Sequence, residues 1–472
     1  MSTKDTKETK QKKTAAPKAE TKAKPEPEAK AEAKAEQKPE AKAEPEAKPK
    51  AEPKPEADTA PAEEDLARRE ERHRRRMRQQ RLYSFIALLV LLVVLGGLGA
   101  GAYFLYTKYF REETPPAETY ADETPEDREK RINASIDEML AGMSLSDKAA
   151  ALMIVTPEQL TGADLVKEDS EQLKAALNTY PVAGLVFDER HFSTEKGLRN
   201  LLSAVKKNSR NPLFLAFREG GGSDSRLSSF LQQPLMSSPS AIAATHEVSE
   251  ARYAGEQIGN YLSRVGFNLN LAPVLHPAKT ALEEACFGLD PEESAAMYQA
   301  FAEGMATNRV FGAAGVFPAP GAEDAGGDPA SNSVNETLEE MESDAFVPFA
   351  SAIEAGTEII IVGNVQAPRA AGDNSPCSLS ESMITGQLRG TLGFQGIVMT
   401  NRLDQSVIVE GYTADAAAVN AILAGADIIL CPSDFLTAHK GIMDALRTGV
   451  LTEERLDRSL KRVYRVLLEY AE

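Results

Sequence analysis

The stretch GIVMTNRLD, residues 396–404, is the part of the chain that says most about its fold. An apolar run leads directly into Thr400, Asn401 and Arg402. A short apolar run of this kind predicts a buried strand, and this strand ends in a polar cluster. In parallel α/β proteins, function gathers at the carboxyl ends of such strands, so the cluster marks a candidate site.

Seven other segments share this character. They lie at 150–156, 184–188, 212–217, 269–273, 311–318, 358–364 and 427–432. Amphipathic helical patterns fall between them, for example at 247–265, 291–308, 337–355 and 412–424. Eight alternating units predict an α/β fold, a (β/α)₈ TIM barrel over residues 130–472, with a last outer helix at 452–470.

The N-terminal third of the chain has a different composition. Residues 1–65 are rich in Lys, Ala, Glu and Pro and carry few large apolar side chains, so we expect a disordered tail. A basic segment at 66–81 precedes the uncharged run 82–106, which predicts one transmembrane helix. Residues 107–129 are expected to form a polar stalk.

The charge distribution predicts an orientation for this arrangement. Eight arginines lie in 66–81 on the N-terminal side of the apolar run. The positive-inside rule then predicts a single-pass cell-membrane protein, with a cytoplasmic N-terminus and an extracytoplasmic barrel. The formal net charge is −18, and the first 81 residues are net basic, so the remainder is strongly acidic. Such a surface argues against nucleic-acid binding.

Five framework segments stand out in the predicted barrel: MSLSDK (143–148), VAGLVF (182–187), GFNLNLAPV (266–274), FGLDP (287–291) and AILAGAD (421–427). Together and in this order, they resemble segments of the β-N-acetylhexosaminidases of glycoside hydrolase family 3. The resemblance covers about residues 130–472 and implies the barrel fold. It also implies hydrolysis of β-linked N-acetylglucosamine, by an aspartate nucleophile and a proton-transferring histidine.

The residues that this chemistry requires are substituted. The family's strand ends Ser/Thr-Asp-Asp-Leu, and its first aspartate, the nucleophile, corresponds to Asn401. The proton-transferring histidine of Lys-His-Phe-Pro-Gly-His-Gly corresponds to Pro320 in GVFPAPG, residues 315–321. An amide carries no charge to form a glycosyl intermediate, and proline cannot transfer a proton. The resemblance therefore implies a degenerate active site.

Other polar residues at the expected strand ends are candidates for replacement or binding roles. On the acid/base loop, Glu323 and Asp324 are either replacement catalysts or a solvated acidic loop. Candidates for substrate binding are Arg218, Glu219, His276, Asn364 and Asp404. His191, His246 and His439 are expected at the surface. No metal or cofactor is expected, because the three cysteines are isolated and lack metal-ligand spacing.

Two functional hypotheses follow from these patterns. The first is a family 3-like envelope protein that has lost turnover and binds a cell-wall glycan, or scaffolds an envelope protein. The second is an active glycosidase that cleaves β-linked N-acetylglucosamine with displaced carboxylates. Loss of a nucleophile or base costs on the order of 10⁴–10⁶ in rate, which favours the first hypothesis. Fold alone does not decide between them.

Overall fold

The structure of the protein, a computed structural model, describes residues 124–275, 283–288, 290–321, 324 and 332–469. All of these belong to one compact unit, Glu118–Glu472. The predicted tail (1–65), basic segment (66–81) and transmembrane helix (82–106) lie outside the described residues. Most of the predicted stalk does so as well, and the first described helix begins at Pro125.

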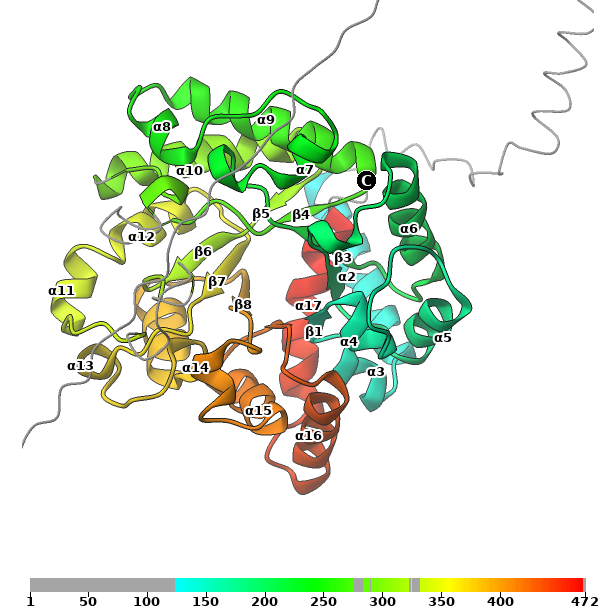
Figure 1. Ribbon diagram of the computed structural model, residues 1–472. Helices are drawn as coiled ribbons and strands as arrows, with labels where there is room; N and C mark the ends of the chain where they lie inside the picture. The colour runs from blue at the N-terminus through cyan, green and yellow to red at the C-terminus, as the bar shows by residue number, and fades with distance from the viewer. Residues whose placement is uncertain (1–123, 276–282, 289, 322–323, 325–331, 470–472) are drawn as a thin grey trace, which may run out of the picture. The chain divides into compact units, whose positions relative to one another are not determined.

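Short parallel strands form the centre of the described unit, and helices lie around them (Figure 1). A strand occurs at each of the eight positions that the apolar runs predict. The strands are β1 Met153–Val155, β2 Gly184–Val186, β3 Phe214–Phe217, β4 Leu269–Asn270, β5 Phe311–Gly312, β6 Ala314–Phe317, β7 Ile359–Val362, β8 Ile397–Thr400 and β9 Ile429–Leu430. Nearly all of their residues are buried, because helices cover one face of each sheet and packed side chains cover the other.

Helices connect the strands and supply the outer layer. The α-helices are α2 Pro125–Gly142, α3 Leu145–Ala150, α4 Pro157–Thr161, α5 Glu171–Thr179, α6 Glu195–Asn208, α7 Arg226–Phe230, α8 Pro239–Ala243, α9 Val248–Val265, α10 Pro291–Ala306, α11 Leu338–Ser343, α12 Val347–Glu354, α13 Pro368–Ala371, α14 Ser406–Val409, α15 Ala414–Ala424, α16 Phe435–Thr448 and α17 Glu453–Glu469. A π-helix, η7, spans Ser382–Thr391, and 3₁₀ turns include η1 Glu189–His191 and η2 Gly222–Asp224.

The predicted fold class is wrong in its central feature, the single closed barrel. The described strands form two separate parallel sheets, one in the order β5-β4-β3-β2-β1-β9 and one in the order β6-β7-β8. Isolated bridges at Val274–Gly315 and Met399–Ile428, and a few backbone hydrogen bonds between the β8 and β9 segments, link the two sheets without a continuous ladder. The observed architecture is therefore an α/β fold built from curved parallel half-barrel sheets. The predicted run 311–318 is interrupted at Ala313, so β5 joins the first sheet and β6 the second.

Side chains explain the break between β8 and β9. The carboxylate of Asp427 accepts the Val398 backbone N–H at 3.0 Å, in the place of a carbonyl of the neighbouring strand. The Thr400 hydroxyl accepts the Leu430 N–H at 3.1 Å. These bonds satisfy the strand edges, as buried backbone groups require, without forming a regular ladder. An apolar run alone cannot predict them.

The transmembrane part of the fold-class prediction gains no support from the structure. In the part of the chain that the structure describes, no helix combines the length and the apolar character needed to cross a bilayer.

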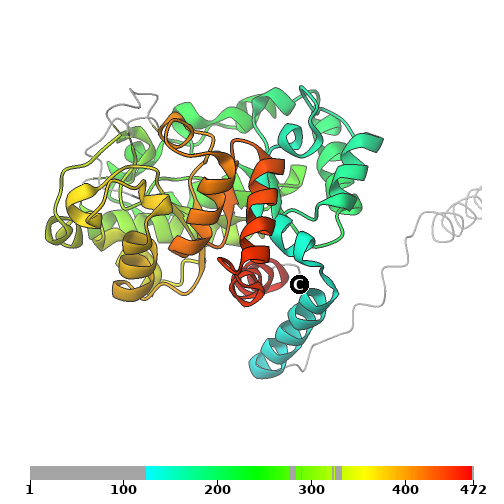
Figure 2. The same cartoon turned by 90° about the horizontal axis from the view of Figure 1, so that it is seen from below.

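The predicted last helix is α17, and its pattern explains its position. Leu456, Leu460, Val463 and Leu467 recur on one face and are buried against the domain. The opposite face contacts α2, where Arg465 donates to Asn133 at 2.7 Å and Lys461 pairs with Asp137 at 2.8 Å. Figure 2 shows α2 extending from the body of the unit beside this helix.

Asp427 also anchors α17 and η7 to the strands. Its Oδ1 atom accepts Ser459 Oγ–H at 2.6 Å and Arg462 Nη1–H at 3.0 Å, and its Oδ2 atom accepts Arg389 Nη2–H at 2.5 Å. The Asp427 side chain is fully buried, and that of Arg389 is 13% exposed. One carboxylate thus joins a strand, a π-helix and the last helix.

Candidate ligand site at the carboxyl ends of the strands

A cavity of about 400 Å³ opens where the strands end. Its wall includes Val186 at the end of β2, Phe217 at the end of β3, Leu430 at the end of β9 and Asn401 just after β8. A second cavity of about 340 Å³ shares Arg218, Asp224, Arg226 and Asp324 with it. The two cavities therefore adjoin on the face where parallel α/β proteins bind their ligands.

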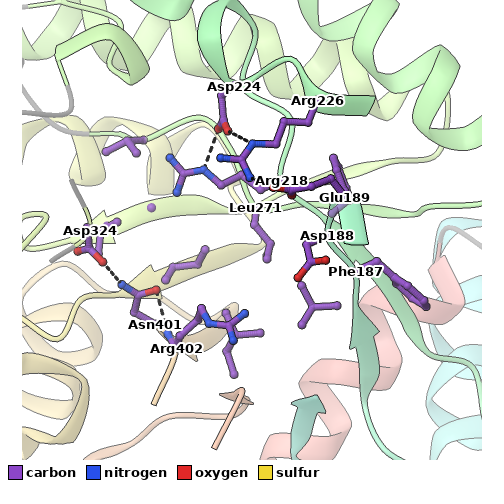
Figure 3. Close-up of a pocket in the computed structure, with 17 residues that line it drawn as sticks. Phe187, Asp188, Glu189, Arg218, Asp224, Arg226, Leu271, Asp324, Asn401 and Arg402 are labelled. Atoms are coloured by element: carbon purple, nitrogen blue, oxygen red, sulfur yellow. Dashed lines mark hydrogen bonds and ion pairs between the residues drawn. The ribbon is translucent and has the colours of Figure 1, made fainter. Parts of the chain in front are cut away.

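The main cavity is lined by both charged and apolar side chains (Figure 3). Its charged lining residues are the acids Asp188, Glu189, Asp224 and Asp324 and the bases Arg218, Arg226 and Arg402. Three of the predicted site residues, Arg218, Asp324 and Asn401, line it together.

Both polar atoms of the Asn401 side-chain amide form hydrogen bonds within the protein. Its Nδ2–H donates to Asp324 Oδ1 at 2.7 Å, and its Oδ1 accepts the Arg402 backbone N–H at 2.9 Å (Figure 3). Its own backbone N–H donates to the Val362 carbonyl at 2.7 Å, which fixes the end of β8 against β7. The amide thus connects β8 to the loop after β6, at the position that the family resemblance assigns to the nucleophile.

Asp324 completes that connection. Its Oδ1 also accepts Gln405 Nε2–H at 2.8 Å, and its Oδ2 accepts the Gly321 N–H at 2.9 Å. Three N–H groups therefore already use this carboxylate as an acceptor, counting Asn401. A general acid or base needs its carboxyl free to face the substrate, so these contacts do not favour Asp324 as a replacement catalyst.

Asn364 and Asp404 lie beside the cavity and support its wall from β7 and β8. The Asn364 Nδ2–H groups donate to the Arg402 carbonyl at 2.7 Å and to Gln405 Oε1 at 2.6 Å. Ser378 Oγ–H donates to Asn364 Oδ1 at 2.6 Å. Asp404 accepts Arg402 Nε–H at 2.9 Å and Nη2–H at 2.5 Å, a two-point ion pair. Both predicted binding residues therefore orient Arg402, which reaches the cavity.

The opposite wall is a chain of ion pairs between β3 and η1. Arg218 Nε–H donates to Asp224 Oδ2 at 2.8 Å, and Arg226 Nη1–H donates to Glu189 Oε1 at 2.7 Å. Arg226 Nε also lies 3.9 Å from Asp224 Oδ1. These side chains are partly exposed, so their pairs add little to stability, but they fix where the guanidinium groups lie.

His191 is buried behind Asp188, contrary to the predicted surface position. Its side chain is 0% exposed, with Nδ1 3.1 Å from Asp188 Oδ1 and Nε2 3.1 Å from Glu158 Oε1. Burial alone would lower the pKa of His191, but the hydrogen bonds to Asp188 and Glu158 outweigh it and raise the pKa to about 9. The same contacts overcome burial to lower the pKa of Glu158 to about 2, and they lower that of Asp188 as well.

This cluster predicts how stability depends on pH. The contribution of His191 is complete below its unfolded pKa of about 6.5 and is lost as pH rises through its folded pKa of about 9. The free energy of unfolding, from urea titrations, should therefore fall between about pH 6.5 and 9. The fall should shrink in His191→Gln. It should persist in His246→Gln, because that histidine side chain is 77% exposed. An equal fall in both variants would contradict this account.

Other predicted site residues do not line the cavity. Glu219 is fully buried and accepts Leu227 N–H at 2.9 Å, Ser228 N–H at 3.0 Å and Tyr261 O–H at 2.9 Å. Burial raises its pKa against the lowering effect of these donors, and the carboxylate holds the start of α7 rather than facing the cavity. Pro320 is buried as well. His276 and Glu323 lie outside the described residues.

Asp188, Glu189, Asp224, Arg226 and Arg402 line the cavity but were not among the predicted site residues. A signal for three of them was present. Asp188 and Glu189 directly follow the strand of VAGLVF, and Arg402 directly follows Asn401, so all three lie at a carboxyl strand end. No comparable signal marks Asp224 and Arg226, which are brought in by the loop after β3.

Parallel strands with surrounding helices and a polar cavity at the carboxyl ends define a class of α/β proteins that bind or transform small ligands at that face. Residues 144–466 match the glycosyl hydrolase family 3 N terminal domain. The chain therefore belongs to glycosyl hydrolase family 3, and it is β-N-acetylhexosaminidase-like.

Individual relatives agree with that assignment. The chain is 27% identical over 336 residues to the beta-hexosaminidase LpqI of Mycobacterium tuberculosis, covering 68% of this chain and 82% of the relative. It is 30% identical over 258 residues to a beta-hexosaminidase of Xylella fastidiosa, covering 53% and 76%. Among solved structures, a glycoside hydrolase family 3 beta-N-acetylglucosaminidase from Paenibacillus matches with a TM-score of 0.62 and 24% identity, over 70% of this chain and 63% of that one. The M. tuberculosis LpqI structure matches with a TM-score of 0.58 and 24% identity, over 70% and 95%.

Proposed function

We propose that this family 3 domain binds a glycan in the cavity at the strand ends and does not hydrolyse it. One observation carries the proposal: Asn401 stands at the nucleophile position with both ends of its amide bonded inside the protein. A retaining glycosidase needs a carboxylate there that is free to attack the sugar. The amide has neither the charge nor the freedom to do so.

The surrounding charge supports the same conclusion. Glycoside hydrolysis passes through a transition state with positive charge on the sugar ring, which carboxylates stabilise. The family resemblance places a second aspartate after the nucleophile, and here that residue is Arg402, which lines the cavity. A guanidinium group opposes the positive charge that develops during the reaction.

The form of the cavity supports binding as the role of this domain. It keeps the volume and the mixed lining of apolar and polar groups that small-molecule sites use. Several relatives are named as hexosaminidases or N-acetylglucosaminidases, so an oligomer of N-acetylglucosamine is the natural first probe. If the domain instead acted only as a scaffold for an envelope protein, the same cavity would bind no sugar.

The experiment is a calorimetric titration of the full chain with chitotriose, followed by mass spectrometry of the recovered sugar. We expect saturable binding and intact trisaccharide. Leu271→Trp, which puts bulk into the cavity, should abolish binding. Leu436→Trp, at a side chain that is 56% exposed, should not. Absence of binding, or recovery of shorter sugars, would overturn the proposal.

A further inference from the structure

The charged groups of the cavity differ in how far the protein satisfies them. Arg218 uses only Nε, on Asp224, and within the described part of the chain its two terminal nitrogens have no hydrogen-bond partner. Arg402 uses Nε and Nη2 on Asp404, and its Nη1 has no hydrogen-bond partner among the residues that the structure describes. Each guanidinium has five N–H groups, so both arginines have N–H groups that are available to donate to a ligand.

Two of the four carboxylates of the same cavity have much less capacity left. Asp324 already accepts N–H groups from Asn401, Gln405 and Gly321. Asp188 accepts three N–H groups of Arg190, those of the backbone N, Nε and Nη2, and lies against buried His191. Glu189 and Asp224 are each bonded to one arginine, at 2.7 Å and 2.8 Å. Every carboxylate that lines the cavity therefore has a donor from the protein, whereas Arg218 and Arg402 keep N–H groups that no described residue accepts.

The two arginines present these donors to one space. Arg218 follows β3 and Arg402 follows β8, and their side chains are 43% and 40% exposed although both line the cavity. In Figure 3 their guanidinium groups lie on either side of Leu271. The terminal nitrogens of Arg218 form the planar fork that matches a carboxylate in a two-point contact.

We propose that the ligand of this cavity is an acidic sugar, whose carboxylate is bound by the terminal nitrogens of Arg218 with Arg402 assisting. This inference rests on the proposed glycan binding and names the class of glycan. A neutral hydroxyl group can also accept these N–H groups, but only an anion gains in addition from the positive charge of the two guanidinium groups. Arg218→Gln removes the charge and keeps a polar side chain that can donate a hydrogen bond, so it isolates the effect of the charge.

The test compares two sugars that differ in one group. The full chain is titrated calorimetrically with D-glucuronate and with D-glucose at low salt. A charge-assisted contact is worth roughly 1.5–3 kcal/mol, so glucuronate should bind at least about tenfold more tightly. Arg218→Gln should bring the two affinities to within about threefold, and added salt should weaken glucuronate more than glucose. Arg252→Gln is the matched control, because Arg252 pairs with Glu303 on the helical surface.

The outcomes separate this inference from the proposed function. Equal affinity for the two sugars, or a preference that survives in Arg218→Gln, overturns the acidic-sugar assignment while leaving glycan binding in place. Binding of neither sugar also overturns it. Circular dichroism shows whether each variant is folded, and Arg402→Gln provides a second variant in which the preference should fall if Arg218→Gln does not fold. Cleavage of chitotriose, by contrast, contradicts the proposed function itself.

Discussion

Replacing Asp427 by alanine should lower the free energy of unfolding by about 3–5 kcal/mol, because it leaves a buried arginine without its counter-charge. Arg389 loses the carboxylate that it meets at 2.5 Å, and the Val398 N–H and Ser459 hydroxyl lose their acceptor. The contact between β8 and β9 should weaken, and the packing of α17 on the strands should weaken with it. Urea unfolding followed by circular dichroism measures the change.

Asp444→Ala is the matched control for this prediction. Asp444 pairs with Lys440 at 2.9 Å on the surface of α16, with its side chain 47% exposed. A surface pair of this kind contributes less than about 1 kcal/mol. If Asp427→Ala were no more destabilising than Asp444→Ala, the carboxylate would not be the anchor described above.

Asn401→Asp, the change that restores the family's nucleophile, should destabilise the protein and restore no hydrolysis. The new carboxylate would face Asp324 Oδ1 across a contact that is 2.7 Å in the native protein. One hydrogen bond is replaced by repulsion between acids, at a cost of about 1–3 kcal/mol near neutral pH. The cost should shrink at low pH, where a proton shared between the two carboxyl groups removes the repulsion.

The double variant Asn401→Asp with Asp324→Asn tests the cause. It removes the repulsion and exchanges donor and acceptor at the contact, so part of the lost stability should return. The rescue stays incomplete because the amide nitrogen that replaces Oδ1 cannot accept the Gln405 Nε2–H. Asn401→Ala removes the bond without adding a charge and should be less damaging than Asn401→Asp. If the double variant were as unstable as the sum of the single changes, the Asn401–Asp324 contact would not be the reason.

The positions of the strands could be predicted from the sequence because each is a buried apolar run of a few residues. Their organisation into sheets could not. The run 311–318 divides at Ala313 between two sheets. Between β8 and β9, the side chains of Asp427 and Thr400 replace backbone hydrogen-bond partners. The periodicity of apolar residues carries no information on either feature. The closed barrel was therefore the wrong expectation, although every apolar run contains a strand.

The candidate site shows the same division. Strand ends predicted Arg218, Asp324 and Asn401, which line one cavity. The roles of their neighbours depend on tertiary contacts: His191 is drawn inside by two carboxylates, and Glu219 is turned inward to hold a helix. A histidine or glutamate beside a strand end looks the same in sequence whether it faces a ligand or the core.

The loss of hydrolysis is the central claim, and the rate of 4-nitrophenol release from 4-nitrophenyl N-acetyl-β-D-glucosaminide tests it most directly. The purified full chain should release it no faster than buffer within error, and Asn401→Ala and Asp324→Ala should not change that rate. Measurable turnover by the wild-type chain that disappears in Asp324→Ala would contradict the account, because it would show that a displaced carboxylate performs the chemistry.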